Sequence, residues 1–136
     1  MEVYRVQPIG RIRSKIKNRE DAPRFYTEGA PNATLEVLAK YSAGLDRIKV
    51  GDEIIVITWL QLAQRDILRV HPRGDASRPL TGVFCTRSPA RPNPLGLHRA
   101  KVLRIKRNLL RIGPIEAIDG TPVVDIKPVV DEANDY

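Results

Sequence analysis

A run rich in proline and arginine is the segment that most restricts how this chain can fold. Between Gly82 and Leu97 the sequence reads GVFCTRSPARPNPLGL, with Pro89, Pro92 and Pro94 inside it. Each proline fixes φ, removes a backbone N–H donor and keeps the preceding residue out of the helical region. The run is therefore excluded from a helix interior and from a central strand, and it predicts an ordered, extended loop.

The two arginines of this loop indicate what it can bind. Arg87 and Arg91 each offer a planar fork of N–H donors, and a stiff loop loses little conformational entropy on binding. The loop is thus suited to an anion or to a planar polar ligand. A solvated basic turn is the alternative, in which the arginines only brace the loop against its own backbone carbonyls.

A second long loop is expected at residues 13–31. It is basic, and Phe25 and Tyr26 give it apolar side chains with which to dock. Loops of this length inside a compact domain are usually functional or disordered. That favours a ligand-facing segment over a flexible surface excursion.

Short runs of β-formers make up much of the remaining chain. Residues 53–62, EIIVITWLQL, are rich in Ile and Val, which favours a buried strand at the centre of the core. Trp59 in this run is more consistent with core packing than with stacking on an adenine ring. Helix is expected only as one short turn within residues 41–48. Other strands are expected at residues 3–12 as an edge strand, from Leu35, at 67–71, at 98–105, and on both sides of Arg107-Asn108.

Turn signals between these strands predict the fold class. Asp119-Gly120 is the dipeptide of a tight hairpin turn, flanked by Ile118 and Val123. Short strands joined by such turns predict an all-β fold, a small single-domain β-barrel with long loops and little helix, over residues 1–136. There is no GxGxxG loop after a strand and no alternation of strands with long helices, so a Rossmann-type site is not expected.

The balance of charges narrows the choice of partner. The chain has 23 Lys and Arg against 16 Asp and Glu, and this net charge of +7 favours nucleic acid through phosphate contacts and counterion release. A solubilising surface is the alternative. Aromatic residues are only 5% of the chain, so one base held in a pocket fits better than stacking along a single strand.

Other function classes are excluded by what the sequence lacks. The single Cys85 allows no internal disulfide, and with two separated histidines it makes no zinc site, so no metal is expected. No run approaches the roughly twenty apolar residues of a membrane span, and the first ten residues do not resemble a signal peptide. We therefore expect a cytoplasmic protein that makes no membrane contact.

Four segments together resemble one known family. They are TRSPARPNPLGL at residues 86–97, AIDGTPVVDIKP at 117–128, IGRIRS at 9–14 and the Pro23-Arg24 pair. These motifs are similar to the TsaA-like (YaeB, TrmO) family, whose best known members are S-adenosylmethionine-dependent tRNA N6-adenine methyltransferases. The resemblance covers nearly the whole chain. It implies a β-barrel that forms a homodimer, with S-adenosylmethionine bound near the subunit interface and tRNA as the partner.

The resemblance also implies particular contacts. A Ser-His pair of the family aligns with Asp52 and Glu53, where a carboxylate can still accept hydrogen bonds from ribose hydroxyls. Ala90 stands where many relatives have Phe, which allows a different or smaller acceptor. The cofactor contacts implied are Pro23, Arg24, Phe25, Glu53, Arg87, Leu97, Glu116, Ala117, Ile118 and Asp119, and the expected substrate or RNA contacts are Arg13, Arg91 and Asn93.

Methyl transfer to an adenine amine sets its own chemical requirements. The acceptor, the methyl carbon and the sulfur must be aligned, so positioning supplies most of the rate. The amine is a poor nucleophile until its proton begins to leave, and a nearby carboxylate can accept that proton. Asp125 and Asp119 are the candidate catalytic residues. The alternatives are a turn-forming role for Asp119 and a salt bridge to Lys or Arg for Asp125.

The leading hypothesis is methyl transfer to N6 of N6-threonylcarbamoyladenosine next to the anticodon of tRNA. Bacterial tRNA-modifying members of the family usually carry a C-terminal extension domain, and no such domain is expected here because the chain stops eight residues after Pro128. That difference and Ala90 motivate one alternative, a methyltransferase with a small-molecule acceptor. The other alternative is a catalytically silent RNA- or ligand-binding barrel.

Overall fold

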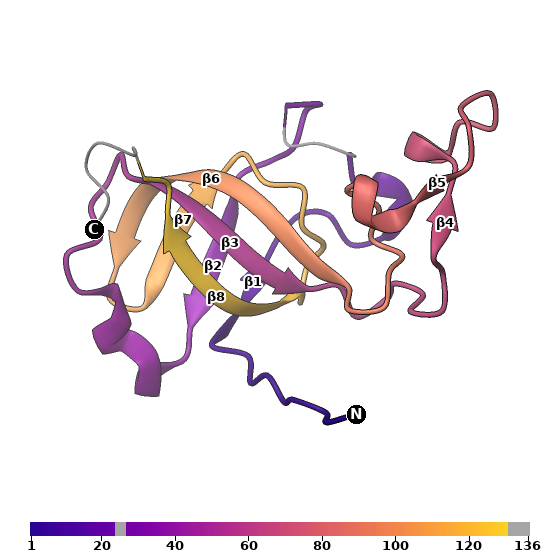
Figure 1. Cartoon of the computed structure of the whole chain (residues 1–136). Coiled ribbons are helices and arrows are strands. Elements are labelled where there is room, and N and C mark those ends of the chain that lie inside the picture. The colour runs from indigo at the N-terminus through magenta and orange to yellow at the C-terminus, as the bar shows by residue number, and fades with distance from the viewer. Residues whose placement is uncertain (24–26, 131–136) are drawn as a thin grey trace.

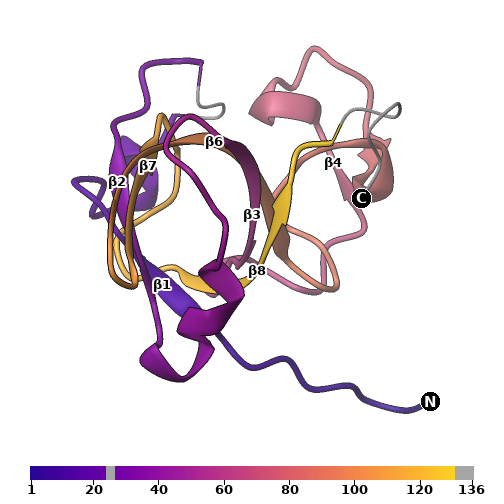
Figure 2. The same ribbon diagram turned by 90° about the vertical axis from the view of Figure 1, so that its left-hand side faces the viewer.

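The computed structural model describes residues 1–23 and 27–130, and its main body is a closed β-barrel (Figure 1). Six strands close it in the order β1-β2-β7-β6-β3-β8, with antiparallel neighbours throughout (Figure 2). The predicted small all-β barrel is confirmed. The strands are β1 (Gly10–Arg13), β2 (Ala33–Val37), β3 (Glu53–Trp59), β6 (Leu95–Lys106), β7 (Leu109–Gly113) and β8 (Pro122–Pro128).

Alternating side chains build the core of the barrel. In β3 the side chains of Ile54, Val56 and Thr58 are buried, and the residues between them are not. On the other side, Ile12, Leu35 and Leu110 form one fully buried row across β1, β2 and β7. Burying a side chain of this size stabilises the fold by about 1.5–3 kcal/mol. A slip of one residue in register would move such a row to the surface.

Helical structure in the described residues is limited to short 3-10 turns. The turn η2 (Ala39–Leu45) overlaps the predicted helical segment at 41–48 and packs Tyr41 and Leu45 against the core. A small hairpin, β4 (Arg69–Val70) with β5 (Thr81–Gly82), projects from one side of the barrel (Figure 1). In the described part of the chain, no helix has the length and apolar character needed to cross a bilayer. The remaining turns are η1 (Arg19–Asp21), η3 (Pro72–Gly74) and η4 (Val83–Cys85).

The edge strand predicted for residues 3–12 is wrong. The strand β1 covers only the end of that range, and it pairs with β2 on one side and with β8 on the other. Residues 1–8 instead form an exposed arm that leads away from the barrel (Figure 1). Pro8 has no N–H to add to a ladder, and a closed barrel leaves no edge for the arm to join.

The hairpin predicted at Asp119-Gly120 is also wrong. The turn itself is present, with Gly120 at φ 83°. The flanking strands β7 and β8 do not pair with each other, because β8 pairs with β1 and β3. A local dipeptide shows that the chain turns, but closure of the barrel decides which strands meet. The turn at Arg107-Asn108 is confirmed, since it joins the paired strands β6 and β7.

Strand boundaries shift where tertiary contacts extend or shorten pairing. The strand β2 begins at Ala33 rather than Leu35, and β3 ends at Trp59 rather than at residue 62. The strand β6 begins at Leu95, three residues before the predicted boundary at 98, because Leu95 and Gly96 still pair with β3. Of the strand expected at 67–71, only β4 forms. Trp59 is half-buried rather than a core residue, and the Arg65 guanidinium lies 5.1 Å from its ring centroid.

Candidate functional site

A chain of polar side chains joins β3 and β6 to the loop between β7 and β8. Thr58 Oγ1 lies 2.7 Å from His98 Nε2, and His98 Nδ1 lies 2.6 Å from Glu116 Oε1. Thr58 and His98 are buried inside the barrel, and the Glu116 side chain is 17% exposed. The sequence predicted a role for Glu116 but not for Thr58 or His98. The signal that could have found them is a polar residue at an inward position of an alternating strand.

The hydrogen bonds in this chain have a defined direction when His98 is neutral. A carboxylate only accepts, so His98 Nδ1–H donates to Glu116, and the Thr58 hydroxyl then donates to Nε2. Glu116 Oε2 is buried and has no hydrogen-bond partner within the described part of the chain. A buried polar atom without a partner costs about 1–3 kcal/mol. The free oxygen is therefore a candidate acceptor for a donor on a ligand.

Gly96 allows β3 and β6 to approach closely beside this chain. A Cβ at this position would clash with Thr58 Oγ1 and would lie 2.8 Å from His98 Nε2. Beyond Gly96 the pairing of β3 with β6 continues into the proline-rich loop, because Leu60 N–H donates to Pro94 O at 2.8 Å. The end of the predicted binding loop is thus held next to Gly96.

Asp119 holds the neighbouring turn together. Its Oδ1 accepts the Ser14 backbone N–H at 2.9 Å, and its Oδ2 pairs with Lys17 Nζ at 3.0 Å. These two bonds, the backbone one first, lower the pKa of the Asp119 carboxyl below its usual value. A carboxylate stabilised in its ionised form is a weaker base. The geometry matches the turn-forming alternative, and a catalytic role for Asp119 stays a prediction.

The two arginines of the proline-rich loop are placed differently. Arg91 donates to three backbone carbonyls of its own loop, those of Ser88 at 2.8 Å, Val83 at 2.7 Å and Thr86 at 2.6 Å. This is the bracing role that the sequence left open. Arg87 is exposed and makes no hydrogen bond or ion pair to any described residue. Of the pair, Arg87 is thus the guanidinium available to a ligand.

Asp125 and Leu97 lie on the outer surface of the barrel. Asp125 is opposite Ile57, and Ile57 is opposite Leu97, so the three residues form one row across β8, β3 and β6. Two strand spacings separate Asp125 from Leu97 by roughly 10 Å. Asp125 Oδ2 lies 3.5 Å from Lys127 Nζ, as the salt-bridge alternative predicts. The row places a half-exposed carboxylate near an exposed apolar side chain.

Glu53 lies at the other end of β3. It accepts a hydrogen bond from Arg99, and this bond with the Arg99 charge lowers the pKa of the Glu53 carboxyl. Together with Asp125, it borders a cleft of about 770 Å³ between η2 and the ends of β3 and β8. Small-molecule sites have volumes of about 300–1,000 Å³. The cleft is therefore large enough for a ligand, and Glu53 at its edge is roughly 17 Å along the strand from Thr58.

The other residues expected at the site are scattered. Arg13 NεH pairs with Glu36 at 2.6 Å, and Asn93 accepts a hydrogen bond from Arg65 at 3.3 Å. Pro23 is half-buried, whereas Arg24 and Phe25 lie outside the described residues. The structure thus brings Glu116, Ala117, Ile118 and Asp119 together in one loop, and it places Glu53 at the far end of β3 from that loop. No group of three or more His, Cys, Asp and Glu side chains suited to a metal occurs in the described ranges.

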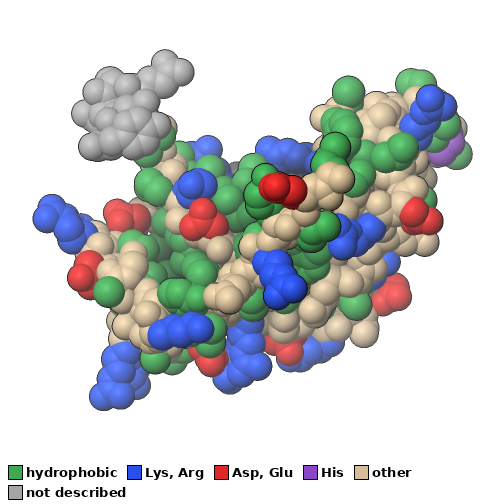
Figure 3. Space-filling model, turned by 60° about the horizontal axis from the view of Figure 1, so that its bottom comes forward, with side chains coloured by type: hydrophobic (Ala, Val, Ile, Leu, Met, Phe, Trp, Pro, Cys, Tyr) green, Lys and Arg blue, Asp and Glu red, His purple; other side chains and the backbone are tan. Residues whose placement is uncertain are grey.

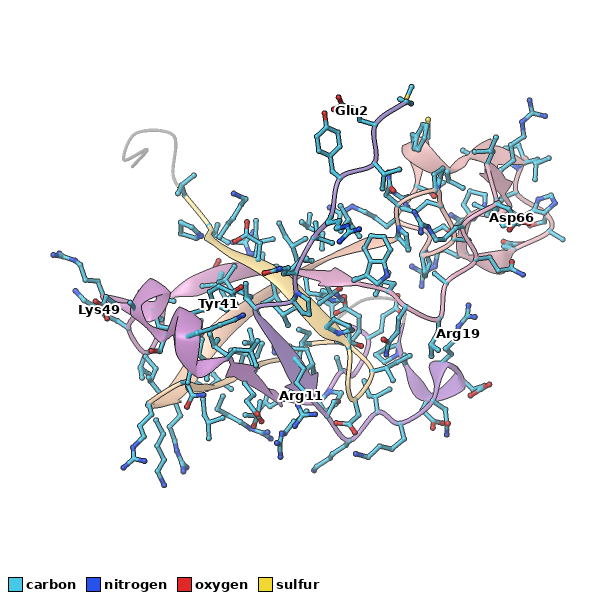
Figure 4. All side chains as sticks on the ribbon, turned by 90° about the horizontal axis from the view of Figure 1, so that it is seen from below. Glu2, Arg11, Arg19, Tyr41, Lys49 and Asp66 are labelled. Carbon is cyan, nitrogen blue, oxygen red and sulfur yellow. The ribbon has the colours of Figure 1, made fainter. Side chains whose placement is uncertain are left out.

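Cationic side chains line the outer face of β1, β2, β7 and β6. Arg13, Thr34, Arg111 and Arg104 form one row across these strands, and Arg111 lies directly opposite Arg104. Like charges placed opposite each other destabilise a sheet unless an anion lies between them. Figure 3 shows Lys and Arg side chains spread among Asp and Glu over one face of the molecule, and in Figure 4 Arg11 projects from β1. The adjacent row holds Arg11, Glu36, Leu109 and Lys106.

Known proteins resemble the chain in both sequence and fold. The family described as the tRNA-methyltransferase O N-terminal domain matches residues 11–135. A probable S-adenosyl-L-methionine-binding protein of Methanothermobacter thermautotrophicus is 40% identical over 97% of this chain and 93% of its own. An S-adenosyl-L-methionine-binding protein of Archaeoglobus fulgidus is also 40% identical, over 95% of this chain and 94% of its own. The crystal structure of TrmO from Pseudomonas aeruginosa has a TM-score of 0.77 at 28% identity, and the match covers 99% of this chain but 60% of that one.

Proposed function

The chain belongs to the tRNA-methyltransferase O N-terminal domain family, and on this premise we propose that it transfers a methyl group from S-adenosylmethionine to tRNA. The proposed acceptor is N6 of N6-threonylcarbamoyladenosine beside the anticodon. The family match over residues 11–135 is the observation that carries the proposal. A cytoplasmic location stays a prediction.

The residues around Glu116 fit the cofactor. When bound, S-adenosylmethionine supplies an activated methyl group on a sulfonium sulfur. Its ribose hydroxyls and its amino group are hydrogen-bond donors, and Glu116 Oε2 is a buried acceptor without a partner among the described residues. Arg87 is exposed and suits the cofactor carboxylate, since guanidinium and carboxylate form charge-assisted bonds.

A homodimer would explain why the expected cofactor contacts are divided. In one copy, Glu53 and Glu116 lie toward opposite ends of β3, whereas the resemblance assigns both to one cofactor. A second copy that brings its own loops to the cleft would unite them. We expect light scattering to give twice the chain mass, and we expect a mixture of Arg87→Ala and Glu53→Gln chains to recover part of the binding that each variant loses.

The basic outer face supports RNA as the partner. Arg104 is exposed and directly opposite Arg111, with no ion pair to a described residue. A phosphate between the two guanidinium groups would relieve their repulsion and release counterions. Arg104→Gln should lower tRNA affinity and reduce the salt dependence of binding by about one counterion. Arg5→Gln, on the exposed arm, removes the same charge elsewhere and should change neither.

Asp125 is the better placed of the two proposed proton acceptors. It borders the cleft, and its carboxylate is held, as far as the described residues go, by the Lys127 ion pair and the Ile126 backbone N–H at 2.9 Å. Asp119 is occupied by Ser14 and Lys17. We therefore assign the acceptance of the amine proton to Asp125, with Asp119 holding the turn beside Glu116.

The test is methyl transfer to tRNA. The purified protein is incubated with methyl-labelled S-adenosylmethionine and unfractionated tRNA, and the RNA is digested to nucleosides for mass spectrometry. We expect label on N6-threonylcarbamoyladenosine, and none with an Arg87→Ala variant that unfolds at the same urea concentration. Cofactor binding without RNA labelling would overturn the tRNA acceptor and favour a small molecule. No cofactor binding by calorimetry would favour a silent binding barrel.

A further inference from the structure

We propose that Thr58 and His98 are positioning residues, which hold Glu116 so that its Oε2 stays free for a hydrogen-bond donor on the bound cofactor. The inference rests on the proposed binding of S-adenosylmethionine. It assigns a function to two buried residues that lie outside the four segments on which the resemblance to the family was recognised.

The rigid part of the barrel holds Glu116 through these two residues. Glu116 lies in the connection between β7 and β8, where a side chain is normally free to change rotamer. His98 binds its Oε1 from β6, and Thr58 binds His98 from β3. Those two strands are paired at seven successive positions. A ligating carboxylate fixed in this way loses little entropy when a ligand binds.

The unpaired oxygen argues against a purely structural network. A network that served only the fold would satisfy every buried polar atom, since an unsatisfied one destabilises the native state. Here the inward neighbours of Thr58 on β3 are Ile54 and Val56, so apolar residues pack well in this layer. The polar chain nevertheless replaces apolar packing and leaves Glu116 Oε2 without a donor among the described residues. A ligand donor would complete the network.

Thr58 acts on Glu116 by holding the His98 ring in place. The Glu116 carboxylate can only accept, so the neutral ring carries its proton on Nδ1 and donates it to Glu116, and the Thr58 hydroxyl donates to Nε2. A Thr58→Val substitution keeps the side-chain shape and removes the bond that ties the ring to β3. The ring is then free to change its orientation, which weakens the Nδ1–H bond to Glu116 Oε1 and lets the carboxylate rotate.

Calorimetric titration with S-adenosylhomocysteine tests the proposal without turnover, because this ligand has the same hydroxyl and amino donors and no methyl group to transfer. We expect Thr58→Val to weaken binding roughly tenfold and Glu116→Gln to weaken it by at least as much. The double variant should bind about as weakly as Glu116→Gln alone, since the two residues act in series. Thr58→Ser keeps the hydroxyl and should bind like the wild type. Thr34→Val, on the outer face of β2, is the matched control.

The ring nitrogens of the histidines give a second readout that needs no cofactor. The chain has two histidines, and His71 lies in the projecting β4–β5 hairpin, where it contacts Arg78 O. In ¹⁵N NMR spectra we expect His98 to be protonated on Nδ1 in the wild type, and we expect this hydrogen-bonded Nδ1–H signal to broaden or shift in Thr58→Val. Adding S-adenosylhomocysteine should move the His98 signals and leave those of His71 in place.

Two results would overturn the positioning role. One is wild-type affinity in Thr58→Val with an unchanged His98 Nδ1–H signal, and the other is full additivity of Thr58→Val and Glu116→Gln. If the wild-type protein itself binds neither S-adenosylhomocysteine nor S-adenosylmethionine, the proposed function fails and the inference fails with it. The wild-type titration therefore separates the two failures.

Discussion

The two ends of β3 hold polar side chains in opposite ways. At the first residue, Glu53 is exposed and pairs with Arg99 beside an open cleft. Near the other end, Thr58 is buried and joins His98 and Glu116 inside the barrel. Water screens the exposed ion pair, so the pair contributes little to the stability of the fold. Breaking the buried network costs more, because it leaves buried polar atoms without hydrogen-bond partners. One strand thus has an end that tolerates substitution and an end where stability and binding depend on the same atoms.

The largest loss of stability is expected from Gly96→Ala, beside the buried end of β3. The new methyl group would meet Thr58 Oγ1 and His98 Nε2, both on well-packed side chains. We expect the free energy of unfolding to fall by about 3 kcal/mol, measured by urea denaturation. Gly82→Ala is the control, because a Cβ there has nothing within 4 Å and should change stability by less than about 0.5 kcal/mol. Equal effects of the two substitutions would show that the buried end is not tightly packed.

Thr58→Val should have the next largest effect on stability. It leaves His98 Nε2 buried without its partner, at an expected loss of about 1–2 kcal/mol in the free energy of unfolding. Thr34→Val removes a hydroxyl from a half-buried position on β2 and should cost less than about 0.5 kcal/mol. If Thr58→Val proves as stable as the wild type, the contrast between the two ends of β3 is wrong.

Asp119→Asn tests a partly exposed carboxylate, whose exposure lies between that of Glu53 and that of Thr58. Its pKa is lowered in the folded state, chiefly by the Ser14 N–H and then by Lys17. Such a group stabilises the fold above its unfolded pKa, and that stability is lost as the pH falls through the folded pKa. We therefore expect the variant to unfold at a lower urea concentration than the wild type at pH 7. The difference between their urea midpoints should narrow once the pH falls below 3.8, the ordinary pKa of an Asp carboxyl. A gap of the same size in acid would contradict this assignment.

The smallest effect on stability is expected from Glu53→Gln. The carboxylate is exposed and its pair with Arg99 is screened by solvent, so the urea midpoint should not change measurably. Calorimetry with S-adenosylmethionine then gives a clear result. Weaker binding at unchanged stability would place the cleft in the cofactor site, and unchanged binding would remove Glu53 from it.

Local patterns in the sequence predicted where strands and turns form better than they predicted which strands pair with each other. The Ile- and Val-rich run gave β3, and Arg107-Asn108 gave the turn between β6 and β7. The same reasoning failed at Asp119-Gly120, where the turn forms but the flanking strands pair elsewhere. It also failed at the N-terminal arm, because scattered β-forming residues pair only when a strand has a free edge beside them.

At the candidate site, too, the sequence predicted individual residues but not which of them contact each other. Motifs pointed to Glu116 and Asp119, and the proline-rich run pointed to Arg87 and Arg91. Only the structure distinguishes Arg91, which braces its loop, from exposed Arg87. Thr58 and His98 were missed, because the two lie 40 positions apart in sequence and each alone resembles an ordinary strand residue.

By itself, the sequence determined the all-β class, the rigid proline-rich loop, the basic charge and the resemblance to one family. Those properties follow from the dihedral limits of proline, the two-residue period of strands and the side chains themselves, all of which are local. The tertiary structure decided which polar residues meet inside the barrel and which oxygen of Glu116 is left free. It could do so because register and closure depend on all six strands at once, and no short segment contains that information.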